Sequence, residues 1–521
     1  LATEDTGTGN VAIGRNALTA LNYDGNGYNT AVGYIAGSSV TTGVNNTLIG
    51  ALTGDAITTA DDNTAVGMSA LSTLTTGDDN AAFGAYALQL ATTSNSNTGL
   101  GYYALRQTTT GVANTGVGTY ALTGNTTASN NTALGRSSLG ANTTGSENTA
   151  VGRSALLANT TGNSNVAIGA NALDASVDKN FNIAIGANAL GVQTGDCYST
   201  AVGDSAMSAN TTGAYNIAMG RLTLATNTTG ANNTAVGYQS LYANTTADNN
   251  VAFGYQAGYS NTTGYNNIAV GKEALKLNTT GAENIAIGTG ALDANTTASN
   301  NTAMGRSALG ATITGGNNTA LGWQAGLAVT GADNTVIGKN AGSGLTTPNQ
   351  NTFVGSGSGS TITSGANNTI LGGYNGNSGG LDIRTGSNNI VLSDGAGVLR
   401  VHINSGGTAA LYAATGNYNQ RCYAGGNGNE FFIDFRRADN TQVGRITTDG
   451  SSANYATTSD YRLKENVVTD WDATTRLKQL KPSRFNFIAE ADRTVDGFLA
   501  HEVQEIVPEA ISGTKDGTED I

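Results

Sequence analysis

The sequence predicts an all-β protein whose main part is a parallel β-solenoid of about 22 coils. A glycine returns every 17 residues along most of the chain, apolar and small residues recur at fixed distances from it, and Gly, Asn and Thr cluster where turns are needed. The series opens at Gly14 and Gly33, proceeds in steps of 17 residues to Gly322, and takes one step of 16 to Gly338 before it ends at Gly372. So regular a period indicates one short unit stacked on itself.

The repeated unit of 17 residues is too short for a helical hairpin, which needs roughly twice that length, and it fits one solenoid coil. Residues 148–162 are a clear copy, and we expect two short strands in each coil. The residue before the repeat glycine is always apolar, as in Val66 and Phe83, and we interpret it as core filling. The small residue three positions after the glycine, such as Ala70, indicates close approach of backbones, and the glycines are expected at corners that need positive φ.

Stacking of the coils is expected to place like residues above like residues. Coils repeat at about 4.8 Å, so the stack would be a rod on the order of 100 Å long. Asn and Thr would then form ladders that satisfy amides and hydroxyls without a large core. The composition agrees, with 73 Gly, only 3 Pro and 12% charged residues. A slim coil buries little apolar area by itself, so we expect the rod to gain stability by association.

The head of the unit resembles the head repeats of trimeric autotransporter adhesins, which carry N-x-V-A-I-G followed by S-x-A. Residues 10–14 and 165–169 both read Asn-Val-Ala-Ile-Gly and carry this resemblance, which covers roughly residues 8–372. It implies an extended parallel β-roll that is a homotrimer. We therefore assign residues 1–372 to a repeat shaft.

Bulk properties exclude some classes of partner. The net charge of −13 argues against a nucleic-acid binder, and no stretch of 18 apolar residues suits membrane insertion. No secretory signal follows Leu1, and we expect the sequence to begin part-way along a longer product with an attachment domain before it. Cys197 and Cys422 lie far apart, so free thiols and a bridge both stay open, with the redox state unresolved. We expect no metal and no cofactor, because His402 and His501 are the only histidines.

Residues 373–458 are expected to form an altered last coil, over 388–395, and a small β-rich distal segment. Alternating patterns over 430–436 and 441–446 indicate short strands. Two interpretations stay open and both can hold: a β cap that closes the open end of the solenoid, or a receptor-binding tip. The candidate receptor contacts are exposed aromatic and basic residues: Tyr412, Tyr418, Arg421, Tyr423, Arg436 and Arg437.

From Ser459 the composition changes again, with more charge and more helix formers. Residues 459–466 read S-D-Y-R-L-K-E-N and match the S-D-x-R-L-K-x-N motif of the peptidase S74 family, followed in the family's order by segments at 480–482, 485–487, 497–500, 502–504, 507–509 and 515–516. The segment 459–517 thus resembles the intramolecular chaperone domains found at the C-termini of bacteriophage tail fibres and tailspikes. The family usually continues into long C-terminal helices that hold the trimer, and we expect residues 459–521 to be a C-terminally incomplete α+β domain of this kind.

The resemblance implies self-cleavage. By position, Ser459 is the nucleophile, Lys464 the general base and Thr458–Ser459 the scissile bond. A serine is a weak nucleophile until a base accepts its proton, and a lysine can serve when burial lowers its pKa. From the residues alone, the favoured interpretation is that Ser459 or Asp460 caps a helix and Lys464 is a solvated charge. No external substrate is expected.

The sequence therefore predicts a homotrimeric viral tail fibre that attaches to a host receptor, a glycan or an outer-surface protein, and contacts other virion tail proteins. It would be made in the bacterial cytoplasm and located in the virion. The alternatives are a bacterial cell-surface adhesin or filament with a trimerising cap, which genomic neighbours would distinguish, and an ice-binding solenoid, which thermal hysteresis would reveal.

Overall fold

A computed structural model describes residues 8–195, 198–407, 409–411, 430–436, 442–448, 453–457, 471–487 and 490–508. The chain divides into two compact units, Leu1–Asn419 and Gln420–Ile521, and each is described by itself. The first unit is the repeat region with its end, and the second holds the remaining strands and both helices.

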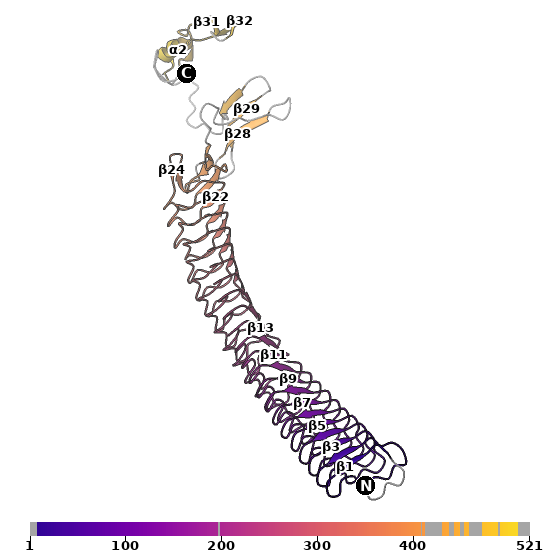
Figure 1. The fold of residues 1–521 in the computed structure, drawn as a ribbon. Helices are drawn as coiled ribbons and strands as arrows, with labels where there is room; N and C mark the ends of the chain where they lie inside the picture. Colours follow the sequence, from indigo (N-terminus) through magenta and orange to yellow (C-terminus); the bar gives the residue numbers. More distant parts are fainter. Residues whose placement is uncertain are drawn as a thin grey trace. The chain divides into compact units, whose positions relative to one another are not determined.

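The repeat region is a parallel β-solenoid with one three-residue strand in each coil, and Figure 1 shows the coils stacked along the unit. Each strand pairs in parallel with the next, one residue to one, so that Ala150 lies beside Ala167. The strands are β1 (Val11–Ile13), β2 (Thr30–Val32), β3 (Thr47–Ile49), β4 (Thr64–Val66), β5 (Ala81–Phe83), β6 (Thr98–Leu100), β7 (Thr115–Val117), β8 (Thr132–Leu134), β9 (Thr149–Val151), β10 (Val166–Ile168), β11 (Ile183–Ile185), β12 (Thr200–Val202), β13 (Ile217–Met219), β14 (Thr234–Val236), β15 (Val251–Phe253), β16 (Ile268–Val270), β17 (Ile285–Ile287), β18 (Thr302–Met304), β19 (Thr319–Leu321), β20 (Thr335–Ile337), β21 (Thr352–Val354) and β22 (Thr369–Leu371).

The expectation of two strands in each coil is wrong. After the strand, the coil of β9 continues through Ser154 and Leu156, whose φ angles are 59° and 51°. Residues in the left-handed backbone conformation cannot continue a strand, so this side of the coil is a series of turns. The turns still join neighbouring coils, because Leu156 N donates to Ala172 O at 3.0 Å.

The core contains fewer large apolar residues than the sequence suggests. The central residue of the strand, such as Ala150, points inward and is fully buried, as are Ala155 and Leu156 on the opposite side. Side chains alternate along a strand, so the residues that flank the central alanine point outward. The prediction that the large residue before the glycine fills the core is therefore wrong: Phe83 is 39% exposed and Leu100 48% exposed.

A buried asparagine before nearly every strand forms a ladder through the stack, and Ser199 takes its place before β12. Asn148 Nδ2 donates to Gly162 O at 2.8 Å, and its Oδ1 accepts from the backbone N of Asn165 at 3.0 Å. A second buried ladder joins Asn159 Nδ2 to Asn142 Oδ1 at 2.9 Å, and threonine hydroxyls form a third, with Thr143 Oγ1 donating to Thr160 O at 3.0 Å. The expected Asn and Thr ladders are confirmed, and they join each coil to its neighbours.

The repeat glycines lie where the expectation put them, at positive φ. Gly152 has φ 130°, and a Cβ at this residue would lie 2.6 Å from Gly169 O of the next coil. Glycine is therefore required at this position for two reasons, the positive φ angle and the close contact between coils.

The solenoid ends in antiparallel strands. A hairpin of β23 (Asn377–Ser378) and β24 (Leu381–Asp382) precedes β25 (Ile390–Ser393), which pairs in parallel with β22 and is the expected altered last coil. Then β26 (Leu399–Ile403) and β27 (Ala409–Leu411) add to β25 in antiparallel order. The fully buried Tyr374 donates its hydroxyl to Leu381 O at 2.8 Å.

The second unit contains a three-stranded antiparallel sheet of β28 (Glu430–Arg436), β29 (Gln442–Thr448) and β30 (Ala453–Thr457). The first two of these strands lie where the sequence predicts short strands. It continues with α1 (Ala473–Leu477), the hairpin of β31 (Ser483–Phe487) and β32 (Glu490–Gly497), and α2 (Ala500–Ile506).

We predict that Gly152→Ala opens the coils around β9 and β10, because the new methyl group would meet the carbonyl of Gly169. Strain at such a backbone angle costs on the order of 1–3 kcal/mol before the clash is added. Hydrogen exchange of the neighbouring strand amides should speed up. Gly191→Ala is the matched control, because its nearest non-neighbouring atom would be 3.6 Å from the new Cβ. Equal exchange in both variants would contradict the prediction.

We also predict that Asn148→Ala lowers the free energy of unfolding locally by about 2 kcal/mol, because the buried backbone N of Asn165 loses its acceptor and Gly162 O keeps only Asn159 Nδ2 of its two side-chain donors. Limited proteolysis with mass spectrometry should locate new cleavage near this coil. Thr161→Ala, at an exposed turn position of the same coil, should leave the digestion pattern unchanged.

Candidate functional site

The helix α1 opens the described part of the C-terminal segment, and an aspartate fixes its start. The Asp472 carboxylate accepts a hydrogen bond from Thr475 N at 3.0 Å, as an N-cap does. Hydrogen bonds from Thr475 lower the pKa of Asp472, because they favour the charged carboxylate.

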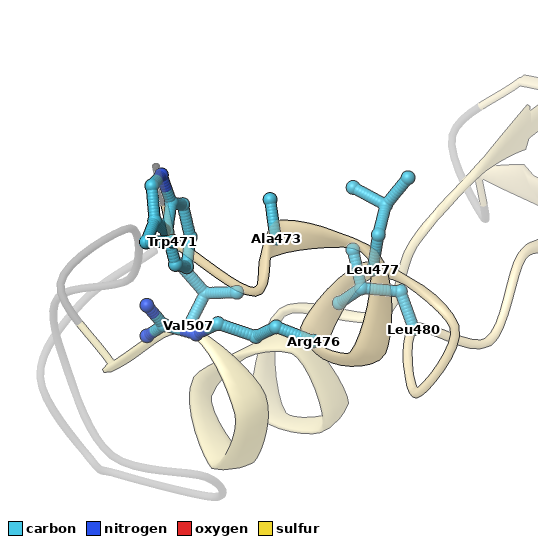
Figure 2. A pocket seen from close by; sticks show the side chains of 6 residues that line it. All are labelled: Trp471, Ala473, Arg476, Leu477, Leu480 and Val507. Atoms are coloured by element: carbon cyan, nitrogen blue, oxygen red, sulfur yellow. The ribbon is translucent and has the colours of Figure 1, made fainter. Parts of the chain in front are cut away.

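Arg476 joins α1 to the end of α2. Its Nε donates to the carbonyl of Ile506 at 2.7 Å, and its guanidinium lies 5.9 Å from the centre of the Trp471 ring. Figure 2 shows these side chains around an apolar cavity of about 330 Å³. The cavity is lined by Trp471, Ala473, Arg476, Leu477, Leu480 and Val507.

The hairpin β31–β32 carries a charged pair between residues that lie opposite each other in the register. Arg484 Nε donates to Asp496 Oδ1 at 2.6 Å, and Arg484 Nη2 donates to Asp496 Oδ2 at 3.0 Å. The arginine lowers the pKa of Asp496. Both side chains are exposed, so solvent screens the pair and it adds little to stability.

The C-terminal segment lacks a core of its own in the part that the structure describes. Between Trp471 and Pro508, every side chain whose burial is described is half-buried or exposed, and neither helix holds a buried residue. Large apolar groups face outward, with Leu477 71% exposed and Trp471 54% exposed. A segment of this composition normally buries such residues, so contacts beyond these residues are needed to cover them.

The predicted catalytic residues Thr458, Ser459 and Lys464 lie outside the described residues, and their roles stay predictions. The last described residue before them is Thr457, the end of β30. The candidate receptor contacts Tyr412, Tyr418, Arg421, Tyr423 and Arg437 also lie outside the described residues, as do Cys197 and Cys422; of Arg436, the end of β28, only the backbone is described.

Two groups of side chains were not predicted from the sequence. Trp471 and Arg476 border the C-terminal cavity, and Asp472, a residue type favoured at N-caps, is the signal that could have indicated a helix start there. On the shaft, rings spaced by 17 residues stack: Phe181 on Tyr198 with centroids 6.1 Å apart, and Tyr198 on Tyr215 at 5.5 Å. The period alone could have revealed these stacks.

Comparison with known proteins finds a family match for one part of the chain. Residues 459–512 match the family model Peptidase_S74, described as chaperone of endosialidase. No curated protein and no solved structure matches the chain. The family match at the C-terminus and the solenoid of about 22 turns fit a tail fibre or tailspike with a chaperone domain of this family, as the sequence predicts. Among the described residues, no helix has the length and apolar character to cross a membrane.

We predict that Arg476→Met weakens the C-terminal segment by about 1–2 kcal/mol, because the hydrogen bond to Ile506 and the contact with Trp471 are both lost. Tryptophan fluorescence, measured with Trp323→Phe so that Trp471 is the only tryptophan, should report unfolding at lower denaturant concentration. Lys478→Met, which removes an exposed charge at the end of α1, is the control and should leave the midpoint unchanged.

Proposed function

We propose that this chain is a trimeric viral tail fibre that reaches the host surface, and that its C-terminal domain is an intramolecular chaperone that cleaves itself off at Thr458–Ser459. The observation that carries the proposal is the peptidase S74 match over residues 459–512, on the C-terminal side of a long parallel β-solenoid. Domains of this family imply trimerisation.

The exposed apolar residues of both units support association of several copies. The C-terminal segment exposes Trp471 and Leu477, and the shaft exposes a large residue at the end of many strands, such as Leu134 and Ile168. Apolar surface in this amount is normally covered by a partner. Three C-terminal segments that cover one another's apolar groups would form a compact unit.

The chaperone role follows from the folding problem of the shaft. Every strand pair in the solenoid joins residues of different coils, and parallel structure of this kind is slow to nucleate. A trimeric unit at one end would align three chains, and coils would then add from that seed. Removal of the seed after folding leaves a fibre that unfolds slowly, which is kinetic stability.

The cleavage step uses the motif residues. Lys464 in its neutral form takes the proton of Ser459 Oγ, and the oxygen attacks the carbonyl carbon of Thr458. The bond from that carbon to the Ser459 nitrogen breaks, the nitrogen takes up a proton, and an ester joins Thr458 to Ser459 Oγ. Water hydrolyses the ester and leaves a carboxylate on Thr458 and a free serine hydroxyl.

Host attachment is the remaining part of the proposal. The candidate receptor contacts Tyr412, Tyr418, Arg421, Tyr423, Arg436 and Arg437 follow the shaft in the sequence, and the segment that contains them becomes the fibre's new C-terminus once residues from Ser459 are removed. The receptor would be a glycan or an outer-surface protein, and other tail proteins would hold the opposite end of the fibre.

We predict that the full-length protein is recovered as a fragment ending at Thr458, whereas Ser459→Ala and Lys464→Met stay intact, because the first lacks the nucleophile and the second the base. Intact mass and the mobility of an unheated gel sample measure cleavage and assembly together. Ser452→Ala, a serine outside the motif, should be cut like the parent. A stable trimer that is never cut would leave the C-terminal domain as a trimerising cap, and cleavage of Ser459→Ala at the same bond would exclude the proposed chemistry.

A further inference from the structure

The strand side of the shaft presents an uncharged stripe, in which the third residue of every strand is apolar and the first is threonine in most strands; we call it the apolar stripe. The first and third residues of β1 to β22 point outward, and in every strand they are Thr, Val, Ile, Ala, Leu, Phe or Met. Many of the third residues are strongly exposed: Ile13 is 59% exposed, Leu134 48% and Met219 45%. With about 4.8 Å between coils, the stripe runs for on the order of 100 Å, longer than the apolar patches that soluble monomers expose.

One edge of this stripe is basic. The residue directly after each repeat glycine follows the strand and points outward. We call the row of these residues along the shaft the basic edge. Seven basic residues occupy it and one acidic residue, Asp204: the basic ones are Arg15, Arg136, Arg153, Arg221, Lys272, Arg306 and Lys339. Arg136, Arg153 and Arg306 form no ion pair within the described part of the chain.

The other edge is acidic. We call the two residues before the buried asparagine of each coil the acidic edge, since they precede the strand in the same coil. It carries eight acidic residues and no basic one: Asp61, Asp62, Asp78, Asp79, Glu147, Asp248, Glu283 and Asp333. The apolar stripe is thus bordered by charges of opposite sign along its two sides.

From this pattern we infer that the strand faces of the shafts pack against one another around a common axis, parallel and in register, with the basic edge of each copy against the acidic edge of the next. This inference rests on the trimer of the proposed function and adds the surface, direction and register of the contact. The occupant of the apolar stripe is another copy of the same chain.

The signs of the two edges select the direction of the chains. Rotation about an axis parallel to the rods brings the basic edge of one copy to the acidic edge of its neighbour. Antiparallel rods packed face to face would bring basic edge to basic edge and acidic edge to acidic edge, which repels. Opposite charges across an interface steer partners and suppress wrong arrangements more than they add affinity.

Half of the acidic-edge residues also select the register, because they lie within one coil of a basic-edge residue; the other four, in the coils of β4 and β5, lie three coils from the nearest one. Glu147 and Arg153 lie on either side of the same strand, β9, and Asp333 and Lys339 lie on either side of β20. Glu283 precedes β17, and its basic counterparts Lys272 and Arg306 follow the neighbouring strands β16 and β18. A stagger of several coils would separate these pairs by more than about a Debye length and leave them screened.

The experiment uses the full-length protein with Cys197→Ser and Cys422→Ser, so that introduced thiols are the only ones. Glu147→Cys combined with Arg153→Cys should give a covalent trimer with a short bifunctional thiol reagent, because each chain offers both edges. Glu147→Cys with Arg221→Cys is the matched register control and should give none, since these residues lie on β9 and β13 coils. Glu147→Cys alone should also give none, and a dimer there would overturn the inference, because like edges would be in contact.

Charge reversal is the second test, independent of the reagent. Arg153→Glu should lower the temperature at which the trimer band disappears from a gel, and adding Glu147→Arg should restore it. A trimer by light scattering without the 147–153 cross-link and without this rescue overturns the inference and leaves the proposed function standing. A monomer that retains the circular dichroism of the solenoid overturns both.

Discussion

The buried asparagine ladder is the interaction on which the shaft depends. Each coil is too thin to hold much apolar material. In the coil of β9, for example, the buried side chains are alanines, a leucine and the two amides of Asn148 and Asn159. A buried amide without partners is costly, and the Asn148 side chain finds partners in both neighbouring coils, at Asn131 and at Asn165. The coils therefore stabilise one another and not themselves, which explains why the repeat occurs in one long stack.

This constraint also orders the surface. Parallel, in-register pairing repeats every outward position at the same place in successive coils, so any preference in the sequence becomes a row along the rod. Apolar residues at the strand ends form the stripe, tyrosines such as Tyr198 and Tyr215 form stacks, and charges separate to the two edges. A solenoid thus turns weak single-residue preferences into long, uniform surfaces suited to contact with a copy of itself.

The two units show complementary needs. The shaft has a complete interior along its length but exposes one apolar face, whereas the described C-terminal segment holds its helices together through Arg476 and exposes Trp471 and Leu477. Both units expose apolar side chains in the single chain. An assembly that forms first at the C-terminal end and then covers the shaft would satisfy both, and it would place the slow step of parallel pairing after the chains are aligned.

The sequence by itself determined the solenoid, the number of coils, the glycine corners and the C-terminal family match, because a strict period and a dense motif are local signals. It could not decide which side of each coil is strand and which is turn, since small residues such as Ala150 and Ala155 occur on both. The tertiary structure decided this: the alternating pleat turns Ala150 inward and Val151 outward, and it moved the large apolar residues from the expected core to the surface. The cavity beside Arg476 likewise could not be predicted from the sequence, because the hydrogen bond from Arg476 to Ile506 joins residues that are 30 apart in the chain.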